Sequence, residues 1–372
     1  MNPIYRINDL DRVFTPALVF YKAIIRDNIA EVIRLARSPK RLCPHVKTHK
    51  TREIARMQIE AGIASHKCAT IAEAEMLAQC EAPDVLIAYP VIGPNVGRVR
   101  ALTTKYPATR FSVLCDHPDG LKGLVAGWSG MPAPLDVMLD INCGFDRTGI
   151  NVGPAAAELY EAIARSPNLN AIGLHVYDGH NSQERLADRE AAVRALITPV
   201  LEMRAALQSK GLPVPRIICG GTPTFAVWAK IDLPGMQCSP GTFVLYDNGY
   251  GAKYPELAGL KPAALVVSRV ISKPTPTRLT TDLGHKAIAA DPPAGKRCIL
   301  LNLPDATAVL QSEEHFGVET PHAAEWNIGD VLYAVPSHIC PTVALHRRAY
   351  VVENNEVVGT WEIASRDRII TV

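Results

Sequence analysis

The sequence predicts an α/β protein, with a parallel (β/α)8 barrel followed by a smaller, mostly-β domain. Short apolar runs with the length of buried strands alternate with helix-period segments from residue 41 to about residue 250. After about residue 255 the helix signals fade, and strand-like runs separated by Pro, Gly or Asn turns replace them. A chain of 372 residues is also long enough to bury a sizeable core.

The barrel is expected to occupy residues 13–252, and the β domain residues 253–372 together with the N-terminal segment 1–12. The expected barrel strands are Leu42–Val46, His66–Ala69, Val85–Tyr89, Phe111–Cys115, Leu135–Ile141, Ala171–Tyr177, Ile217–Cys219 and Met236–Cys238. Helical periodicity is clearest over Thr51–Ala61, Ile71–Gln79, Ala155–Arg165 and Glu184–Lys210.

Strand signals in the second domain cover Ala264–Ile271, Arg278–Asp282, Cys298–Leu303, Asp330–Val335, Ala349–Glu353 and Glu356–Ile363. One early strand, Ala17–Tyr21, precedes the barrel strands and is followed by a helix over Lys22–Ala36. Its position leaves two alternatives open, because it can join the β domain or cap the barrel.

Composition argues for an ordinary globular enzyme that binds a small molecule. Apolar residues make up 48% of the chain and charged residues 20%, and the net charge of +2 gives no electrostatic preference for nucleic acid or membranes. No apolar run has the length of a membrane span, and the N-terminus does not resemble a signal peptide. The nine cysteines are scattered without paired spacing, which favours a reducing, cytoplasmic location.

Lys47 is the first candidate for chemistry. It lies in the run RLCPHVKTHKT at the end of the first expected barrel strand, where barrel enzymes carry their active sites. A lysine in the barrel mouth can lose its proton through desolvation and form an imine with a carbonyl compound. The alternative is a solvated lysine on a basic loop beside Lys50 and Arg52.

Two glycine turns are candidates for phosphate binding. The run CGGTPT, with Gly220, Gly221 and Thr222, follows the seventh expected strand, and SPGTFVLYD, with Gly241 and Thr242, follows the eighth. Glycines let backbone N–H groups approach an anion closely, and phosphate sites of barrels often lie after these two strands. The alternative is that both are ordinary loop turns.

Further polar residues follow the fifth and sixth expected strands. Arg147, in LDINCGFDRTGI, can donate hydrogen bonds to a phenolate or a carboxylate, unless it only pairs with an aspartate at the surface. In GLHVYDGH, His175 and Tyr177 share one face of a strand. These residues and His180 can contact a cofactor ring or move protons, although structural roles are as common.

A metal site is predicted at PSHIC. The run ends an expected strand, and an extended backbone would direct His338 and Cys340 to the same face. Imidazole and thiolate ligands favour zinc, and two protein ligands leave positions open for water and substrate. The alternative is a buried structural Cys beside a capping His.

Taken together, the runs PHVKTHKT, DRTGI, HVYDGH, GGTPT, SPGTFVLYD, SEEH and PSHIC resemble the metal-activated D-threonine aldolase and eukaryotic-type D-serine dehydratase family. The resemblance extends from TPALVFY to PSHIC and implies the alanine-racemase-like fold, fold type III of pyridoxal-phosphate enzymes. It also implies a homodimer whose active sites are completed by the partner's β domain, and a divalent metal, with zinc favoured and manganese or magnesium possible.

The resemblance implies a role for each candidate residue. Lys47 would form the imine with pyridoxal 5'-phosphate, Arg147 would contact the phenolic oxygen of the cofactor, and Tyr177 would lie near its ring. Gly220, Gly221, Thr222, Gly241 and Thr242 would hold the phosphate. His338 and Cys340 would bind the metal, with His315 of the SEEH run beside it.

The reaction expected from the resemblance is cleavage of a D-β-hydroxy amino acid into glycine and an aldehyde, with His180 as the candidate for moving the hydroxyl proton. Dehydratase-type elimination to a keto acid and ammonia is the alternative, because Cys340 matches the dehydratases whereas YDGH is closer to the aldolases. A racemase needs no metal pair, and a non-catalytic pyridoxal-phosphate carrier needs no β domain, so both are less favoured.

Overall fold

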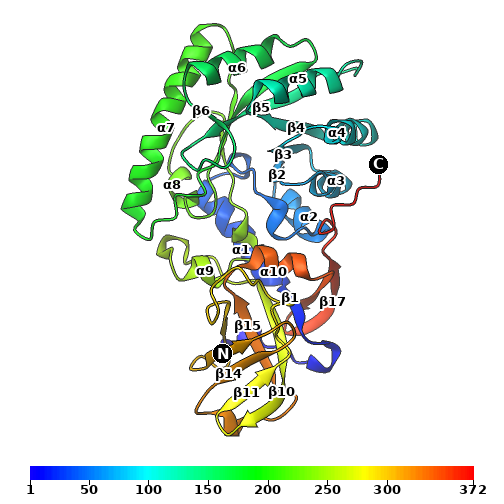
Figure 1. Cartoon of the computed structure of the whole chain (residues 1–372), viewed down its shortest axis with the longest axis vertical. Helices are drawn as coiled ribbons and strands as arrows, with labels where there is room; N and C mark the ends of the chain where they lie inside the picture. Colours follow the sequence, from blue (N-terminus) through cyan, green and yellow to red (C-terminus); the bar gives the residue numbers. More distant parts are fainter. The chain divides into compact units, whose positions relative to one another are not determined.

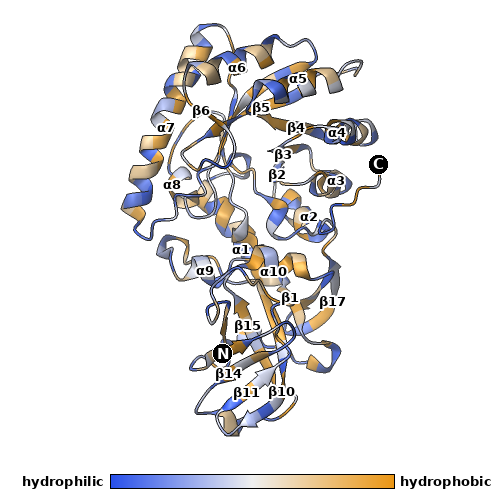
Figure 2. Cartoon of the chain, viewed as in Figure 1, coloured by the Kyte–Doolittle hydropathy of each residue, from blue (hydrophilic) through white to orange (hydrophobic).

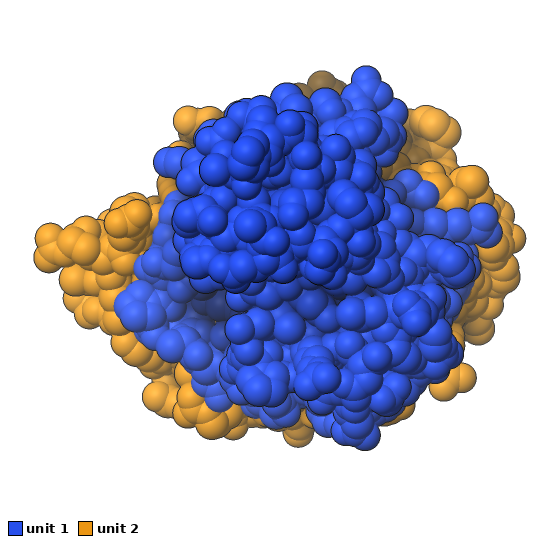
Figure 3. Space-filling view, turned by 90° about the horizontal axis from the view of Figure 1, so that it is seen from below, with its two compact units in different colours: residues 1–31, 48–54, 242–366 blue, residues 32–47, 55–241, 367–372 orange.

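The computed structural model describes residues 1–372 and divides into two compact units. The barrel unit comprises residues 32–47, 55–241 and 367–372, and the β unit comprises residues 1–31, 48–54 and 242–366 (Figure 3). The β unit therefore includes more of the N-terminus than the segment 1–12 expected from the sequence. It also includes a short insertion directly after Lys47.

The barrel unit is built on a parallel sheet with the strand order β2-β3-β4-β5-β7-β8-β9, and β6 pairs with β5 (Figure 1). Its strands are β2 (Ser65–Cys68), β3 (Asp84–Pro90), β4 (Arg110–Cys115), β5 (Leu135–Asn142), β6 (Ile150–Asn151), β7 (Leu169–Val176), β8 (Arg216–Cys219) and β9 (Met236–Cys238). Seven of the eight barrel strands expected from the sequence are therefore present, with ends shifted by a few residues.

The remaining expected strand, Leu42–Val46, closes the barrel through single bridges instead of a continuous ladder. Leu42 pairs in parallel with Cys238 of β9, and His45 pairs in parallel with Lys67 of β2. The backbone N–H of Cys43 donates to the carbonyl of Cys238 at 2.9 Å, and that of Lys67 donates to the carbonyl of Pro44 at 2.8 Å. The predicted barrel fold is confirmed.

Side chains from different strands fill the interior of the barrel. One buried cluster contains Cys43, Leu86, Leu114, Met138, Ile172 and Ile218. Each of these residues comes from a different strand or, for Cys43, from the closing segment, which is the layered packing expected of a barrel core. Full burial of such a side chain contributes roughly 1.5–3 kcal/mol. The strands carry the most hydrophobic residues, whereas helices such as α7 also carry hydrophilic ones (Figure 2).

Helices surround the strands of the barrel unit (Figure 1). They are α3 (Ile71–Gln79), α4 (Pro94–Lys105), α5 (Pro118–Gly127), α6 (Pro154–Arg165), α7 (Leu186–Ser209) and α8 (Phe225–Trp228); α1 (Lys22–Ala36) and α2 (Arg52–Glu60) contribute residues to both units. Helix α3 has the predicted bounds because its capping is local. Thr70 accepts a hydrogen bond from the N–H of Glu73 at 3.1 Å, and Glu73 accepts one from the N–H of Ala69 at 2.7 Å.

His66 of β2 is fully buried, and neither of its ring nitrogens has a hydrogen-bond partner. Burial lowers its pKa from 6.5 to about 4. Between these two pH values the unfolded chain therefore binds more protons at His66 than the folded chain. The free energy of unfolding is thus unaffected by this residue above pH 6.5 and decreases as the pH falls toward 4. We expect this residue to lower the free energy of unfolding in acid by up to about 3 kcal/mol.

Urea unfolding at pH 7 and at pH 4.5 tests this prediction. His66→Leu should reduce the loss of stability between the two pH values, because leucine does not titrate. The exposed His315→Gln is the control for removing a histidine. An unchanged pH dependence in His66→Leu would contradict the prediction.

The β unit contains a sheet with the order β13-β14-β11-β10-β1-β16-β17, in which β15 pairs with both β10 and β12. Its strands are β1 (Ala17–Tyr21), β10 (Ala264–Thr275), β11 (Arg278–Thr281), β12 (Cys298–Leu300), β13 (Thr307–Gln311), β14 (Phe316–Glu319), β15 (Val331–Pro336), β16 (Arg348–Glu353) and β17 (Glu356–Glu362). The unit also holds two short helices, α9 (Asn248–Gly251) and α10 (Ile339–Leu345).

Strand β1 belongs to this sheet, which decides between the two alternatives left by the sequence. It pairs antiparallel with β10 and parallel with β16. All five of its residues are buried, as expected of a central strand. Strands β13 and β14 and helix α10 have no counterpart among the elements predicted from the sequence.

None of the helices is both long enough and apolar enough to span a membrane. All nine cysteines are free, and the most exposed of them, Cys143, Cys298 and Cys340, are only partly buried.

Candidate active site

Lys47 faces a cavity of about 380 Å³ in the barrel unit. The lining residues are His45, Lys47, Lys67, Ala69, Ala88, Tyr89, Pro90, Arg147, Thr148, His175 and Tyr177. Three of them, Lys47, Lys67 and Arg147, carry cationic groups, and none carries a carboxylate. The cavity is therefore suited to a ligand with more than one negative charge.

The three cationic side chains converge on the ring of Tyr177. The Nζ atoms of Lys47 and Lys67 lie 5.9 and 5.3 Å from the ring centroid, and the guanidinium carbon of Arg147 lies 4.5 Å from it. Like charges this close repel one another, and the face of one aromatic ring offsets only part of that cost. An anion bound among them would relieve the repulsion. The structure therefore brings together three residues singled out in the sequence: Lys47, Arg147 and Tyr177.

Lys67 belongs to a buried polar network of which only His175 was singled out from the sequence. Its Nζ lies 3.4 Å from Nε2 of His175, and Nδ1 of His175 lies 2.6 Å from a carboxylate oxygen of Asp140. Asp140 also accepts a hydrogen bond from the hydroxyl of Thr148 at 2.9 Å. The only local signal for Lys67 was its position within a buried strand, where lysine is rare.

Burial sets the protonation of this network. Desolvation lowers the pKa of Lys67 to about 8. Desolvation and the positive charge of Lys67 lower the pKa of His175, so its ring is held neutral. Burial alone would raise the pKa of Asp140, but the contacts with His175 and Thr148 lower it, and its carboxylate stays charged. Asp140 therefore orients the His175 ring toward Lys67.

The two predicted phosphate turns contact each other. The N–H of Gly241 donates to the hydroxyl of Thr222 at 3.2 Å. Gly220 has φ +77°, and a Cβ there would meet Cδ1 of Trp228 at 2.5 Å, so no side chain fits. A Cβ at Gly221 would meet the Tyr177 ring at 3.2 Å, so this turn packs against a wall of the Lys47 cavity. The residues present fit a phosphorylated cofactor.

Asp178 holds the first of these turns in place. Its carboxylate is fully buried and accepts hydrogen bonds from the hydroxyl of Thr224 at 2.8 Å and from Nε1 of Trp228 at 2.9 Å. Burial raises its pKa. With both oxygens engaged, Asp178 is a structural anchor between the end of β7 and the start of α8.

His180 lies outside the Lys47 cavity lining. Its ring stacks on Phe145 with a centroid distance of 5.6 Å and an interplanar angle of 26°, and Phe145 in turn lies 6.1 Å from the Tyr177 ring. The Nδ1 atom of His180 is buried without a hydrogen-bond partner. The structure thus connects His180 to the cavity through aromatic contacts.

The predicted geometry of PSHIC is wrong. Strand β15 ends at Pro336, His338 is the N-cap of α10, and Cys340 lies in the first turn of that helix, so no extended backbone aligns the two side chains. They are close nevertheless. A hydrogen bond with Cys340, together with one of 2.5 Å between Nδ1 of His338 and the carboxylate of Asp291, raises the pKa of His338 to about 9.

Cys340 also contacts residues that directly follow two predicted cofactor ligands in the chain. Its Sγ lies 3.1 Å from the hydroxyl of Thr48, which follows Lys47, and 3.7 Å from the hydroxyl of Thr242, which follows Gly241. Asp247 fixes the start of α10, because its carboxylate accepts hydrogen bonds from the N–H groups of Ile339 at 3.0 Å and Tyr250 at 3.1 Å.

The structure contains no group of three or more His, Cys, Asp or Glu side chains arranged to hold a metal ion. His315 lies in the exposed turn between β13 and β14. His338 and Cys340 offer one nitrogen and one sulfur, and Asp291 can orient the imidazole by accepting from its other nitrogen. This donor set fits a metal site that draws its remaining ligands from substrate and water.

A (β/α)8 barrel with a cationic lysine cavity, joined to a strand-rich unit, is the architecture of the alanine-racemase-like class. The model of the alanine racemase N-terminal domain matches residues 22–246, more than half of the chain, and the chain belongs to that family. The model of a putative serine dehydratase domain matches residues 263–352.

Two relatives and one solved structure are similar to this chain over nearly its whole length. A D-threonine aldolase of Arthrobacter sp is 28% identical over 366 residues, covering 96% of this chain and 94% of the relative. A D-serine dehydratase of Dictyostelium discoideum is 24% identical over 398 residues, covering 95% of this chain and 98% of the relative. The crystal structure of D-threonine aldolase from Filomicrobium marinum has a TM-score of 0.90 at 25% identity, covering 98% of this chain and 99% of that one.

These findings confirm the resemblance seen in the sequence, and they confirm a lyase of the pyridoxal-phosphate-dependent fold type III group. Pyridoxal phosphate is the cofactor expected of this family, and D-amino acids are its expected substrates. The cationic cavity and the paired glycine turns fit that cofactor.

Proposed function

We propose that the protein is a pyridoxal-phosphate- and divalent-metal-dependent lyase that cleaves a D-β-hydroxy amino acid into glycine and an aldehyde. The observation that carries the proposal is the Lys47 cavity, which gathers three cationic side chains and no carboxylate around one tyrosine ring. An amino acid substrate and a phosphorylated cofactor together supply the missing negative charge.

Each candidate residue then has a part in holding the cofactor. Lys47 would bind it covalently, Arg147 would donate to its phenolic oxygen, and Tyr177 would lie against its ring. The turns at Gly220, Gly221, Thr222 and at Gly241, Thr242 would hold its phosphate. When bound, pyridoxal phosphate supplies an electron sink for the bond broken at the substrate Cα.

The remaining groups move protons and hold charge. The amine of Lys47 would accept or return a proton at the substrate Cα. His175 stays neutral and Lys67 stays beside it, so this pair places an adjustable positive charge at the cavity wall. His180 is our candidate for taking the proton of the β-hydroxyl, supported by its free, buried Nδ1 atom.

A metal at His338 and Cys340 would supply a Lewis acid for the β-oxygen of the substrate when bound. The thiolate favours zinc over manganese or magnesium. The Asp291 carboxylate, at 2.5 Å from Nδ1 of His338, provides the orienting contact that metal-binding histidines commonly have.

The second candidate function is elimination of water from a D-β-hydroxy amino acid, as in a D-serine dehydratase. Cys340 favours it, because the resemblance gives the dehydratases a cysteine at this position, and the putative serine dehydratase domain model matches the segment that contains it. Both reactions use the same groups. They differ in whether the Cα–Cβ bond or the Cα–H bond is broken first.

Product analysis separates the two functions. We expect holoenzyme with zinc or manganese to form glycine and acetaldehyde from D-threonine, with L-threonine as the inactive control. Pyruvate and ammonia from D-serine, without glycine from D-threonine, would favour the dehydratase. Turnover of neither substrate nor of longer β-hydroxy analogues would contradict the proposed lyase function.

We also infer a homodimer, an inference that depends on the resemblance to the homodimeric family. Light scattering of the holoenzyme should give about twice the chain mass of 40.3 kDa. A fully active monomer would contradict it.

A further inference from the structure

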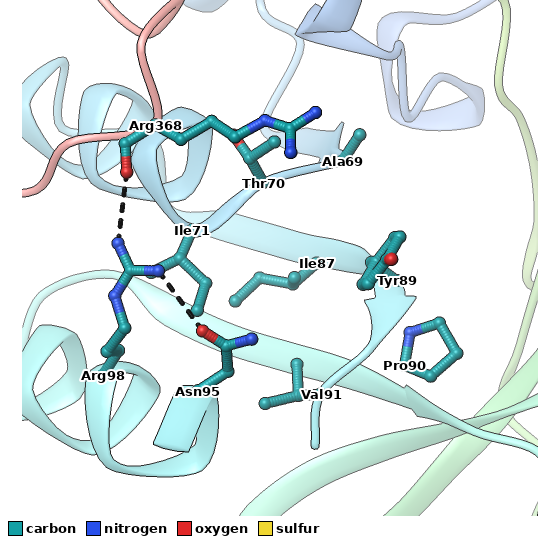
Figure 4. Close-up of a pocket in the computed structure, with 10 residues that line it drawn as sticks. All are labelled: Ala69, Thr70, Ile71, Ile87, Tyr89, Pro90, Val91, Asn95, Arg98 and Arg368. Atoms are coloured by element: carbon teal, nitrogen blue, oxygen red, sulfur yellow. Dashed lines mark hydrogen bonds between the residues drawn. The ribbon is translucent and has the colours of Figure 1, made fainter. Parts of the chain in front are cut away.

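A second cavity of about 330 Å³, drawn by itself in Figure 4, lies in the barrel unit beside the Lys47 cavity. The two share Ala69, Tyr89 and Pro90 as lining residues. Strands β2 and β3 end at this shared wall. None of the groups assigned above to cofactor or metal lines the second cavity.

The second cavity combines an apolar floor with a basic rim. Ile71, Ile87 and Val91 form the apolar part, and the side chains of Arg98 and Arg368 lie at its edge (Figure 4). Arg98 donates to the side-chain oxygen of Asn95 at 3.2 Å and to the backbone carbonyl of Arg368 at 3.2 Å. Neither guanidinium pairs with a carboxylate of the barrel unit, so both charges remain available to a ligand.

The C-terminal segment is tied down so that Arg368 stays at this edge. The hydroxyl of Thr371 donates to Glu75 at 2.5 Å and accepts from Nζ of Lys105 at 2.8 Å, and its N–H donates to Glu75 at 2.8 Å. Glu75 belongs to α3 and Lys105 to α4, the helices that follow β2 and β3. The segment thus spans two helices and adds a cation to a cavity that already holds Arg98.

We propose that this cavity is the subsite for the substrate's β-substituent, and that it selects an apolar spacer, such as a phenyl ring, ending in a carboxylate. The inference rests on the proposed lyase function, because the cavity shares three lining residues with the cavity that holds Lys47. The apolar floor takes the spacer, and the guanidinium groups at the rim offer hydrogen-bond donors to the carboxylate. A methyl substituent, as in threonine, fills none of it.

Binding to the holoenzyme tests the subsite without turnover. By calorimetry, 4-(hydroxymethyl)benzoate should bind about 10- to 100-fold more tightly than the neutral 4-(hydroxymethyl)benzamide, the range expected of hydrogen bonds to charged groups. Arg98→Met and Arg368→Met should each remove most of this difference. Arg368 is exposed, so its replacement is not expected to disturb folding. Arg165→Met, an exposed charge on α6, is the matched control and should keep the difference.

Turnover provides the second arm. The ratio of kcat/KM for β-(4-carboxyphenyl)-D-serine to that for β-phenyl-D-serine should fall about 10- to 100-fold in Arg98→Met and stay constant in Arg165→Met. Equal acid and amide binding, or an unchanged ratio in both arginine variants, would overturn the subsite even if D-threonine is cleaved. Arginine-dependent binding of the acid without cleavage of any substrate would instead overturn the lyase function and leave the subsite standing.

Discussion

Replacement of Lys47 by alanine should abolish covalent cofactor binding and reduce turnover by at least about 10³-fold, the scale of losing a positioned proton-transfer group together with the covalent attachment. The wild-type holoenzyme should show the visible absorbance of lysine-bound pyridoxal phosphate. Borohydride treatment followed by peptide mapping should place the cofactor on Lys47. The physical reason is the position of Lys47, whose amine lines the same cavity as Lys67 and Arg147 and lies 5.9 Å from the centroid of the Tyr177 ring.

Lys67 provides the stringent comparison for this experiment. It lines the same cavity, is fully buried and has a pKa lowered to about 8, so it is the other amine able to react with an aldehyde. We expect Lys67→Met to keep the label on Lys47, with a shifted pH dependence of the cofactor absorbance because a nearby positive charge is lost. A label on Lys67 in the wild type would refute the assignment of Lys47.

Replacement of Cys340 by alanine should leave cofactor absorbance and fold intact but lower turnover of β-hydroxy substrates by at least about 10²-fold. Lewis-acid assistance by a metal is worth several kcal/mol, and about 1.4 kcal/mol corresponds to a tenfold change in rate. With one nitrogen ligand left, the site would bind metal too weakly to polarise the β-oxygen. Metal content should fall in parallel, as measured by elemental analysis after dialysis.

Controls separate loss of the metal from loss of packing around Cys340, whose thiol contacts Thr48. Cys340→Ser keeps a small polar side chain but weakens the ligand, and should behave like alanine. Cys298→Ala removes a partly buried thiol elsewhere in the β unit and should keep both metal and activity. Chelator treatment of the wild type should reproduce the Cys340→Ala phenotype reversibly. Wild-type activity of Cys340→Ala in excess chelator would show that the pair is structural.

The barrel and most of its elements were predictable because their determinants are local. Helix α3 begins at a capping box formed by Thr70 and Glu73, three residues apart, and β9, of sequence Met-Gln-Cys, is a short run between turns. The same applies to the glycine turns and to Lys47, which owe their predicted positions to the ends of strands. The sequence motifs that surround them were sufficient for the family.

Helix α10 shows where local pattern failed. Its β-branched Ile339, Thr342 and Val343 favour a strand, but Pro341 is tolerated in a first helical turn, and the start of the helix is capped by Asp247 from 92 positions away. The two side chains of His338 and Cys340 therefore interact, as expected, but not through the extended backbone that the pattern predicted. Strands β13 and β14 were missed for a related reason, because β13 is largely exposed and shows no clean alternation.

Local motifs were thus enough to identify the class of enzyme, because they depend on capping, turns and strand ends within a few residues. Long-range contacts decided the rest. Lys67 meets His175 across 108 positions of sequence, and Arg98 meets the backbone of Arg368 across 270. Whether a lysine is an exposed charge or a buried amine with a lowered pKa depends on its neighbours in space. Those neighbours come from distant parts of the chain, so no short run of sequence specifies them.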